Sequence, residues 1–260
     1  CGADCNNCPL KDTEDIVYPE ANRAAQIAIV ADHPSEFEVR YTRPLVGPTT
    51  KIFSDALRDS PMTRGQFHIT MSVLCRPPDN DMKKLLGKVR KANRKIKSMN
   101  RKLAKEGQET YALIKTPQEC CAPRLENELK DFNKFLTLGS YATKAVLHKK
   151  ASVMDLRGSP TTIRRGDRDI KVVPTFHPAM VTKSLRWSIP FKNDILKAIK
   201  WFSQGLDWQP PTIIYHPSAS ELREFFSQPD VSYWAYDVET DGIECLTANL
   251  RCIAIGTAKY

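Results

Sequence analysis

The sequence predicts an α/β domain built on a mostly parallel sheet, followed by the beginning of a second, smaller domain. Two observations lead to this fold class. Short apolar, β-branched runs, which are typical of buried strands, alternate along the chain with longer segments that carry helix signals. Polar or turn-forming residues follow several of these runs directly, and the sites of parallel α/β sheets lie at the carboxyl ends of strands. We therefore expect the loops after the strands to carry the chemistry of the domain.

Four strands and their helices can be assigned in chain order. Strands are expected at residues 26–31, 67–74, 135–139 and 170–174. Helices are expected at residues 49–57, 117–130, 141–148 and 190–202. The helix that begins at Pro117 has the clearest signal, a capping box with proline in the first turn. The loops at Asp32, Cys75 and His177 would all lie at carboxyl ends of strands.

A domain boundary is expected at residues 208–211, where the sequence Trp-Gln-Pro-Pro interrupts the pattern. A short strand at residues 212–215, a helix at residues 220–226 and a new segment from residue 232 onward would follow the boundary. The two expected domains cover residues 1–207 and 208–260.

The positive charge of the chain is concentrated in one segment. The net charge is +9, and residues 83–105 contain eleven Lys or Arg and no Asp or Glu. The rest of the chain then holds 28 of the 39 basic residues against all 30 acidic ones, so it is slightly acidic. A basic balance favours polyanionic partners. We expect this segment to be part of a basic helical insertion at about residues 80–115.

The basic segment also has a helical pattern. Apolar residues from Met82 to Leu103 recur at alternating spacings of three and four, which predicts a helix of about six turns with one apolar stripe. Two interpretations stay open: a solvated helix packed on the domain, or an arm that contacts DNA phosphates. The candidate DNA-binding residues are Lys88, Arg90, Lys91, Arg94, Lys95, Lys97, Arg101 and Lys102.

Composition argues against several classes of protein. The apolar runs are far shorter than the roughly 18 residues of a membrane span, so no membrane partner is expected. Eight cysteines in 260 residues are too few for a disulfide scaffold, and no signal-peptide pattern is present. We expect a cytoplasmic protein in a reducing compartment.

Four cysteines form a candidate metal site. Cys5 and Cys8 make a Cys-x-x-Cys pair, Cys75 directly follows the second expected strand, and Cys121 lies in the helix that begins at residue 117. Four thiolates from distant parts of one domain can close a tetrahedral site. From the ligand spacing alone, zinc and an iron–sulfur cluster both stay open.

Seven short motifs occur in a fixed order, at residues 5–10 (CNNCPL), 30–35 (VADHPS), 43–47 (RPLVG), 69–78 (ITMSVLCRPP), 121–125 (CAPRL), 138–139 (LG) and 176–179 (FHPA). Together they resemble the iron–sulfur, family 4-like branch of the uracil-DNA glycosylase superfamily over residues 5–203. The resemblance implies a three-layer α/β/α domain. It also implies a [4Fe–4S] cluster, in preference to zinc, on Cys5, Cys8, Cys75 and Cys121, since the family frame fits Cys121 better than Cys120.

The resemblance also assigns the residues of base excision. Excision needs a flipped base, a group that stabilises the departing base anion and a carboxylate near the sugar. Asp32 replaces the glutamate of the family, and His177 matches its motif histidine, for which a turn residue before Pro178 is the alternative. In the base pocket, Leu45 replaces an aromatic residue and Met71 replaces an asparagine. Because a methionine cannot hydrogen-bond the amide edge of uracil, we expect weak or absent excision.

Residues 236–243 (YDVETDGI), with a further strand at residues 249–256, carry a second pattern. They resemble the first motif of the 3′–5′ exonuclease of polymerase I-like DNA polymerases, which implies the first strands of an RNase H-like domain. Asp237 and Glu239 would point to the same side of a strand. The resemblance makes them catalytic ligands of Mg²⁺ or Mn²⁺ in an incomplete site.

The two resemblances together predict the N-terminal DNA-handling region of a bacteriophage family A DNA polymerase, located in the host cell cytoplasm. Its partners would be DNA, the rest of the polymerase chain and replication proteins. The glycosylase-like domain would bind DNA and be weak or inactive in uracil excision. Two alternatives stay open: an active uracil-DNA glycosylase that removes uracil by N-glycosidic hydrolysis, and a structural or partner-docking module of a phage replication complex.

Overall fold

The computed structural model describes residues 2–148, 152–205, 213–228, 234–242, 244 and 247–257. The chain divides into two compact units, residues 1–206 and 207–260. The expected linker at residues 208–211 lies outside the described residues. In the part of the chain that the structure describes, no helix is long and apolar enough to cross a membrane.

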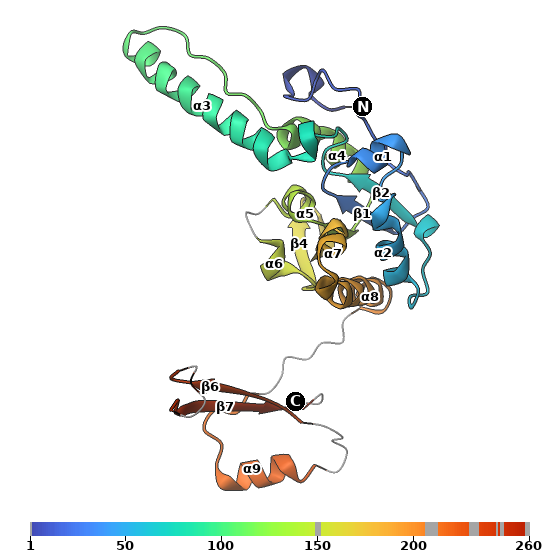
Figure 1. Cartoon of the computed structure of the whole chain (residues 1–260), viewed down its shortest axis with the longest axis vertical. Helices are drawn as coiled ribbons and strands as arrows, with labels where there is room; N and C mark the ends of the chain where they lie inside the picture. The colour runs from blue at the N-terminus through green and yellow to red at the C-terminus, as the bar shows by residue number, and fades with distance from the viewer. Residues whose placement is uncertain are drawn as a thin grey trace. The chain divides into compact units, whose positions relative to one another are not determined.

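A five-stranded sheet forms the centre of the first unit (Figure 1). Its strands, in sheet order, are β2 (Phe67–Met71), β1 (Ile27–Ala31), β3 (Lys134–Leu138), β5 (Arg168–Thr175) and β4 (Thr161–Arg165). The first four run parallel, and β4 pairs antiparallel with β5 at one edge. The predicted α/β fold with a mostly parallel sheet is therefore confirmed.

Helices cover both faces of the sheet. The longer ones are α2 (Pro48–Leu57), α4 (Pro117–Leu129), α5 (Ser140–Leu147) and α8 (Ser188–Gln204). The shorter ones are α1 (Glu36–Arg40), α6 (Val153–Leu156) and α7 (Ala179–Lys183), together with the 3₁₀ helices η1 (Cys5–Asn7), η2 (Arg64–Gln66), η3 (Pro78–Asn80) and η4 (Leu185–Trp187).

Alternate residues of β1 divide the core into two layers. Ile27, Ile29 and Ala31 pack with residues of α2, α7 and α8 in one apolar cluster. Ala28 and Val30 pack with residues of α4 and α5 in a second cluster on the opposite face. All five residues of β1 are consequently buried, which is why the strand reads as a continuous apolar run rather than an alternating one.

The edge strand β4 was not predicted from the sequence. Its residues alternate between half-buried and exposed, and Ile163 is its one large apolar residue. The strand exists because a turn at Gly166 returns the chain onto β5, with Ile163 opposite Ile170. A polar edge strand of this kind carries little of the apolar signal by which buried strands are recognised.

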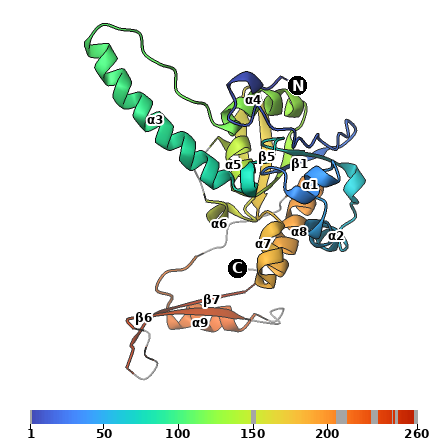
Figure 2. The ribbon, with the colours of Figure 1, turned by 45° about the horizontal axis from the view of Figure 1, so that its top comes forward.

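The helix α3 (Met82–Lys105) is 24 residues long, as the apolar stripe predicted. It extends away from the sheet, and the chain that follows it runs back alongside (Figures 1 and 2). The buried residues of α3 are Met82 and Val89, both near its beginning. We refer to residues 82–115 as the arm.

The second unit contains α9 (Ala219–Phe226) and an antiparallel pair of strands, β6 (Ala235–Thr240) and β7 (Leu250–Gly256). Trp234 packs its ring on Phe225 and Phe226, with centroids 4.8 and 5.0 Å apart. The short strand expected at residues 212–215 does not form at residues 213–215, and residue 212 lies outside the described residues. A short apolar run without a partner strand has no ladder to join, and this explains the failed prediction.

A buried arginine ties α4 to the end of β2. The Arg124 guanidinium donates to the carbonyls of Met71 (2.7 Å) and Ser72 (3.3 Å), to the Thr70 hydroxyl (3.1 Å) and to Glu128 (2.6 Å). Burial raises the pKa of Glu128, but its hydrogen bond to His68 and the nearby Arg124 outweigh burial and leave that pKa below its ordinary value. The network fixes the strand end from which the next loop departs.

We expect Arg124→Met to lower the free energy of unfolding by about 3–5 kcal/mol, because it leaves Glu128 buried without its cation. Urea denaturation measures the change. The exposed Arg23 provides the control, since Arg23→Met should change stability by no more than about 0.5 kcal/mol. A loss below about 1 kcal/mol for Arg124→Met would show that the network contributes only as an ordinary surface contact does.

Candidate functional site

The register of the parallel strands brings four loop beginnings to one edge of the sheet. Ala31 lies opposite Met71 on one side and opposite Leu138 on the other, and Leu138 lies opposite Thr175. The residues that follow these positions therefore meet at the same edge. They are Asp32, Ser72, Gly139 and Phe176, with His177 next along the chain.

The Asp32 carboxylate caps the first turn of α5. Its Oδ1 accepts a hydrogen bond from the backbone N–H of Ala142 at 2.8 Å, and the N–H of Tyr141 also points to it. Gly139 has φ +101°, and a Cβ at this position would overlap the carboxylate. Only a glycine combines this backbone conformation with such a close approach. Gly139 was noted in the sequence as part of a motif, but its role in seating Asp32 was not predicted.

The pKa of Asp32 is raised from 3.8 to about 7. Burial is the main cause, and the N–H groups of Ala142 and Tyr141 oppose it without cancelling it. The carboxyl group therefore exchanges its proton near neutral pH. A carboxyl group of this kind can serve either as a charged stabiliser of a cation or as a proton acceptor.

His177 follows β5 and faces into the same edge as a neutral imidazole. Its Nδ1 accepts a hydrogen bond from the backbone N–H of Ala179 at 3.3 Å, which places the proton of the neutral ring on Nε2. Nε2 is buried and has no hydrogen-bond partner among the residues that the structure describes. Burial, reinforced by the nearby His33, lowers the pKa of His177 to about 4. The ring thus presents an unpaired N–H donor at physiological pH.

The adjacent His33 is also part of this edge. Its ring lies 6.0 Å from that of Tyr141, and burial lowers its pKa. The structure leaves its ring half-buried. Since Tyr141 lies in α5, the loop after β1 and the start of α5 form one wall of the site.

The two predicted base-pocket residues lie behind this edge in the apolar core. Leu45 is 0% exposed and Met71 is 1% exposed, and both belong to the cluster that also contains Phe176. Two hollows of the described chain lie elsewhere. One is lined by residues of β4 together with Glu126, and the other lies at the amino ends of β1 and β3.

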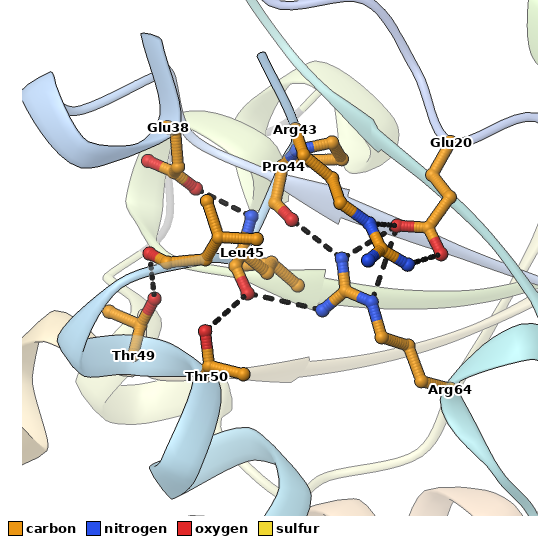
Figure 3. Close-up of polar contacts among 9 residues, drawn as sticks. Glu20, Glu38, Arg43, Pro44, Leu45, Thr49, Thr50 and Arg64 are labelled. Atoms are coloured by element: carbon orange, nitrogen blue, oxygen red, sulfur yellow. Dashed lines mark hydrogen bonds and ion pairs between the residues drawn. The ribbon is translucent and has the colours of Figure 1, made fainter. Parts of the chain in front are cut away.

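The loop that carries Leu45 is held by charged side chains on both sides (Figure 3). The Leu45 N–H donates to Glu38 at 2.6 Å. Arg64 donates to the carbonyls of Pro44 (2.6 Å) and Leu45 (3.1 Å), and it pairs with Glu20 at 2.7 Å. These contacts hold Leu45 at φ +50°, in the left-handed region that a leucine rarely adopts. Neither Glu38 nor Arg64 belongs to a motif, so neither was predicted as part of the site.

The predicted cysteine ligands gather at the root of the arm. Cys8 and Cys121 lie in a small buried cluster, with Cys75 packed against it. Burial, together with the charges of Cys121, Cys8 and Cys5, raises the pKa of the Cys75 thiol to about 11, so the other three thiols lie near Cys75. In the described part of the chain, no group of three or more metal-binding side chains is already arranged as a metal site.

The other predicted residues belong to the arm and to the second unit. The arm carries the candidate DNA-binding lysines and arginines on α3. In the second unit, Asp237 and Glu239 are both exposed on β6, opposite Ala254 and Cys252 of β7. Their role as exonuclease ligands of Mg²⁺ or Mn²⁺ stays a prediction.

Comparisons with known proteins match the first unit. Residues 18–202 match the family model of the uracil DNA glycosylase superfamily. The chain is 27% identical over 186 residues to the type-4 uracil-DNA glycosylase of Thermotoga maritima, which covers 69% of this chain and 79% of that protein. It is 25% identical over 187 residues to the protein of the same name from Sulfurisphaera tokodaii (67% and 70% covered). It is also 25% identical over 210 residues to that from Pyrobaculum aerophilum (78% and 90% covered).

The raised pKa of Asp32 predicts a pH dependence of stability. Between pH 3.8 and about 7 the unfolded chain releases this proton while the folded chain retains it, so the contribution of Asp32 to stability falls as pH rises. At about 1.4 kcal/mol per pH unit, Asp32→Asn should gain up to about 4 kcal/mol relative to the parent over this range. Because His177 acts in the opposite sense, only the difference between variant and parent is informative.

Chemical denaturation of both proteins from pH 4 to pH 8 measures this difference. Asp131→Asn, at an exposed position, is the matched control. A parent-to-variant difference that stays constant over the whole range would contradict a shifted Asp32.

Proposed function

This chain belongs to the uracil DNA glycosylase superfamily, and we propose that it excises uracil from DNA by hydrolysing the N-glycosidic bond. The observation that carries the proposal is the neutral His177, whose buried Nε2–H has no partner among the described residues and lies at the same sheet edge as the Asp32 carboxyl group. A buried donor without a partner is costly, and a bound ligand that accepts its hydrogen bond would remove that cost.

The expectation of a polymerase N-terminal region with a weak or inactive glycosylase domain is wrong. The family match covers residues 18–202, and the relatives that it resembles are named type-4 uracil-DNA glycosylases. These findings favour the alternative of an active glycosylase, and nothing in them supports a polymerase chain or replication proteins as partners. The expectation failed because it gave more weight to the substitutions at Leu45 and Met71 than to the carboxylate and histidine that remain.

Stabilisation of the departing base is the first requirement of the reaction. When the bond between the sugar carbon and the base nitrogen breaks, its electron pair leaves with uracil as an anion, and the negative charge spreads to the ring oxygens. A preorganised neutral N–H donor stabilises such a charge as it develops. We assign this role to Nε2–H of His177. The lowered pKa makes it a hydrogen-bond donor that retains its proton, so uracil leaves as the anion.

Stabilisation of the positive charge on the sugar is the second requirement, and we assign this role to Asp32. An ionised carboxylate offsets the positive charge that develops on the sugar, and it can hold the water whose oxygen adds to the sugar carbon and whose proton is released. With a pKa of about 7, the carboxyl group is ionised in about half of the molecules at neutral pH. Binding of the sugar cation would shift this balance toward the carboxylate.

Leu45 and Met71 stand at the positions that the family resemblance assigns to the base pocket. Both are packed in the core. Neither side chain can hydrogen-bond the edge of uracil, which leaves selection to the shape of the pocket, to His177 and to backbone groups.

We propose that Cys5, Cys8, Cys75 and Cys121 hold a [4Fe–4S] cluster, with zinc as the alternative. The donor set fits, because the four thiols converge from three segments and the N–H of Leu10 points to the sulfur of Cys8 at 3.4 Å. Cys121, and not Cys120, is the neighbour whose charge acts on Cys75. The cluster would supply no chemistry to the bond that breaks. It would fix the N-terminal segment against α4 and the root of the arm.

Uracil release from a single-stranded and a double-stranded oligonucleotide tests the excision proposal. In single-turnover reactions, His177→Ala should lower the rate by about 100- to 1000-fold, the effect of losing one oxyanion donor. His216→Ala, which changes an exposed histidine in the second unit, should leave the rate unchanged. If the parent releases no uracil, or if His177→Ala releases it as fast, the proposal fails.

The adjacent cysteines Cys120 and Cys121 provide a matched test of the cluster. Cys121→Ser should lose iron and acid-labile sulfide from anaerobically purified protein and should unfold at a lower temperature. Cys120→Ser changes the adjacent buried thiol and should retain both. Equal iron in the two variants would contradict the assignment of Cys121, and zinc without iron in the parent would favour the alternative metal.

A further inference from the structure

The cations of α3 lie on one side of the helix. At about 100° per residue, the eleven basic residues fall within about half of the circumference. The other half contains Leu85, Val89, Ile96 and Leu103, together with Asn93 and Asn100. The arm is therefore a helix with one wholly cationic face. The basic residues are Lys83, Lys84, Lys88, Arg90, Lys91, Arg94, Lys95, Lys97, Arg101, Lys102 and Lys105.

The opposite face is covered by the returning chain. Asn93 donates from Nδ2 to the carbonyl of Ile114 and accepts from its N–H, both at 2.8 Å. Asn100 makes the same pair of bonds with Tyr111, at 2.8 and 2.9 Å. Two side chains one heptad apart thus fasten the return segment to α3. A basic amphipathic helix that enters a lipid surface needs a free apolar face, and here the return segment is fastened along part of that face.

The cationic face is almost without internal partners. Among the described residues, Lys84 is the one basic residue of α3 that forms an ion pair, with Asp79 at 2.8 Å. The other ten basic side chains have no carboxylate within ion-pair distance in the described chain, and all eleven residues are exposed. Charge of one sign held along a rigid rod repels itself unless an anionic partner neutralises it.

The root of the arm lies beside the candidate active site. The charge of Asp81, which caps α3, acts on His33 and on Tyr141. The charge of Arg90, two turns along the helix, also acts on Tyr141. DNA that places a nucleotide at the Asp32 edge would therefore pass close to the beginning of the cationic face.

The dimensions of the arm fit a straight, rigid polyanion. At 1.5 Å per residue, the 24 residues of α3 span about 36 Å, which is about one turn of B-form DNA. Duplex DNA carries one negative charge per roughly 1.7 Å of its axis. Single strands are usually bound by stacking their bases on a series of aromatic side chains, whereas the arm contains a single aromatic residue, Tyr111, and α3 contains none.

We propose that the arm, residues 82–115, binds the sugar–phosphate backbone of duplex DNA beside the excision site, without regard to sequence. The use of this contact rests on the proposed function, because the duplex would be the flank of a uracil-containing substrate. The binding itself does not depend on excision. The arm binds the DNA, and Asp32 and His177 at the sheet edge carry out the chemistry.

The experiment uses the 260-residue chain and a uracil-free duplex, with binding followed by fluorescence anisotropy between 50 and 200 mM salt. The test variant carries Lys91→Gln, Arg94→Gln and Lys95→Gln on the cationic face. The control variant carries Lys130→Gln, Lys197→Gln and Lys200→Gln, which remove the same charge from exposed positions of the first unit away from the arm. Circular dichroism verifies that both variants retain the helix content of the parent.

Loss of three phosphate contacts should reduce the slope of log affinity against log salt by about 2.7. The loss of affinity between 50 and 200 mM salt should then be about 40-fold smaller than in the parent, and the control should behave as the parent does. His177→Ala should bind with the parental slope even though it no longer excises. Failure of excision and failure of the arm are thus separate results.

Two outcomes would overturn the proposal. The first is a test variant whose affinity and salt slope equal those of the control. The second is a single-stranded oligonucleotide of the same length that binds the parent as tightly as the duplex does and loses as much affinity in the test variant, because the arm would then not select duplex DNA.

Discussion

The parallel register of β1 with β2 and β3, and of β3 with β5, is the constraint on which the site depends. It places the ends of four strands at one edge, so that loops distant in the sequence begin side by side, about 4.8 Å apart from one strand to the next. Each loop then needs only a short reach to contribute its side chain. Asp32 is one residue past its strand and His177 two residues past its strand. A shift of one register step would turn a buried side chain toward the opposite face and separate the pair.

This edge moves the pKa values of its two ionisable groups in opposite directions for one physical reason. Burial disfavours the charged form of each group, so the carboxyl group gains protons and the imidazole loses them. The result is a histidine that stays neutral through the physiological range and an acid that titrates within it. The same desolvation that gives the site these properties also opposes stability, as buried functional groups commonly do.

Much of the fold could be predicted because its core elements carry local signals. The apolar runs of β1, β2, β3 and β5 and the long stripe of α3 each depend on side chains within the element itself. The edge strand β4 carries one large apolar residue and takes its place from a turn and a neighbouring strand. The apolar run near residue 213 shows the converse, since a strand-like sequence without a partner does not become a strand.

The candidate site likewise contains residues that could be predicted from the sequence and residues that could not. Asp32 and His177 follow strands and lie in motifs, so they could be named from the sequence. The close approach of Gly139 and the grip of Glu38 and Arg64 on the Leu45 loop arise from residues that meet only in the folded chain. The function was misjudged because substitutions at Leu45 and Met71 are visible in a sequence, whereas the burial that prepares His177 is not.

Asn93 and Asn100 fasten the return segment to α3 at two points, and the distance between these points can be compared along the helix and along the return segment. From Asn93 to Asn100 the helix advances seven residues, or about 10.5 Å, while the returning chain moves three residues, from Ile114 to Tyr111, or about 10 Å. Seven residues of the helix and three residues of the return segment therefore cover nearly the same distance. An arm of this construction can therefore lengthen or shorten by one unit of seven helical and three extended residues while its ends, and the cysteines on either side of it, keep their places.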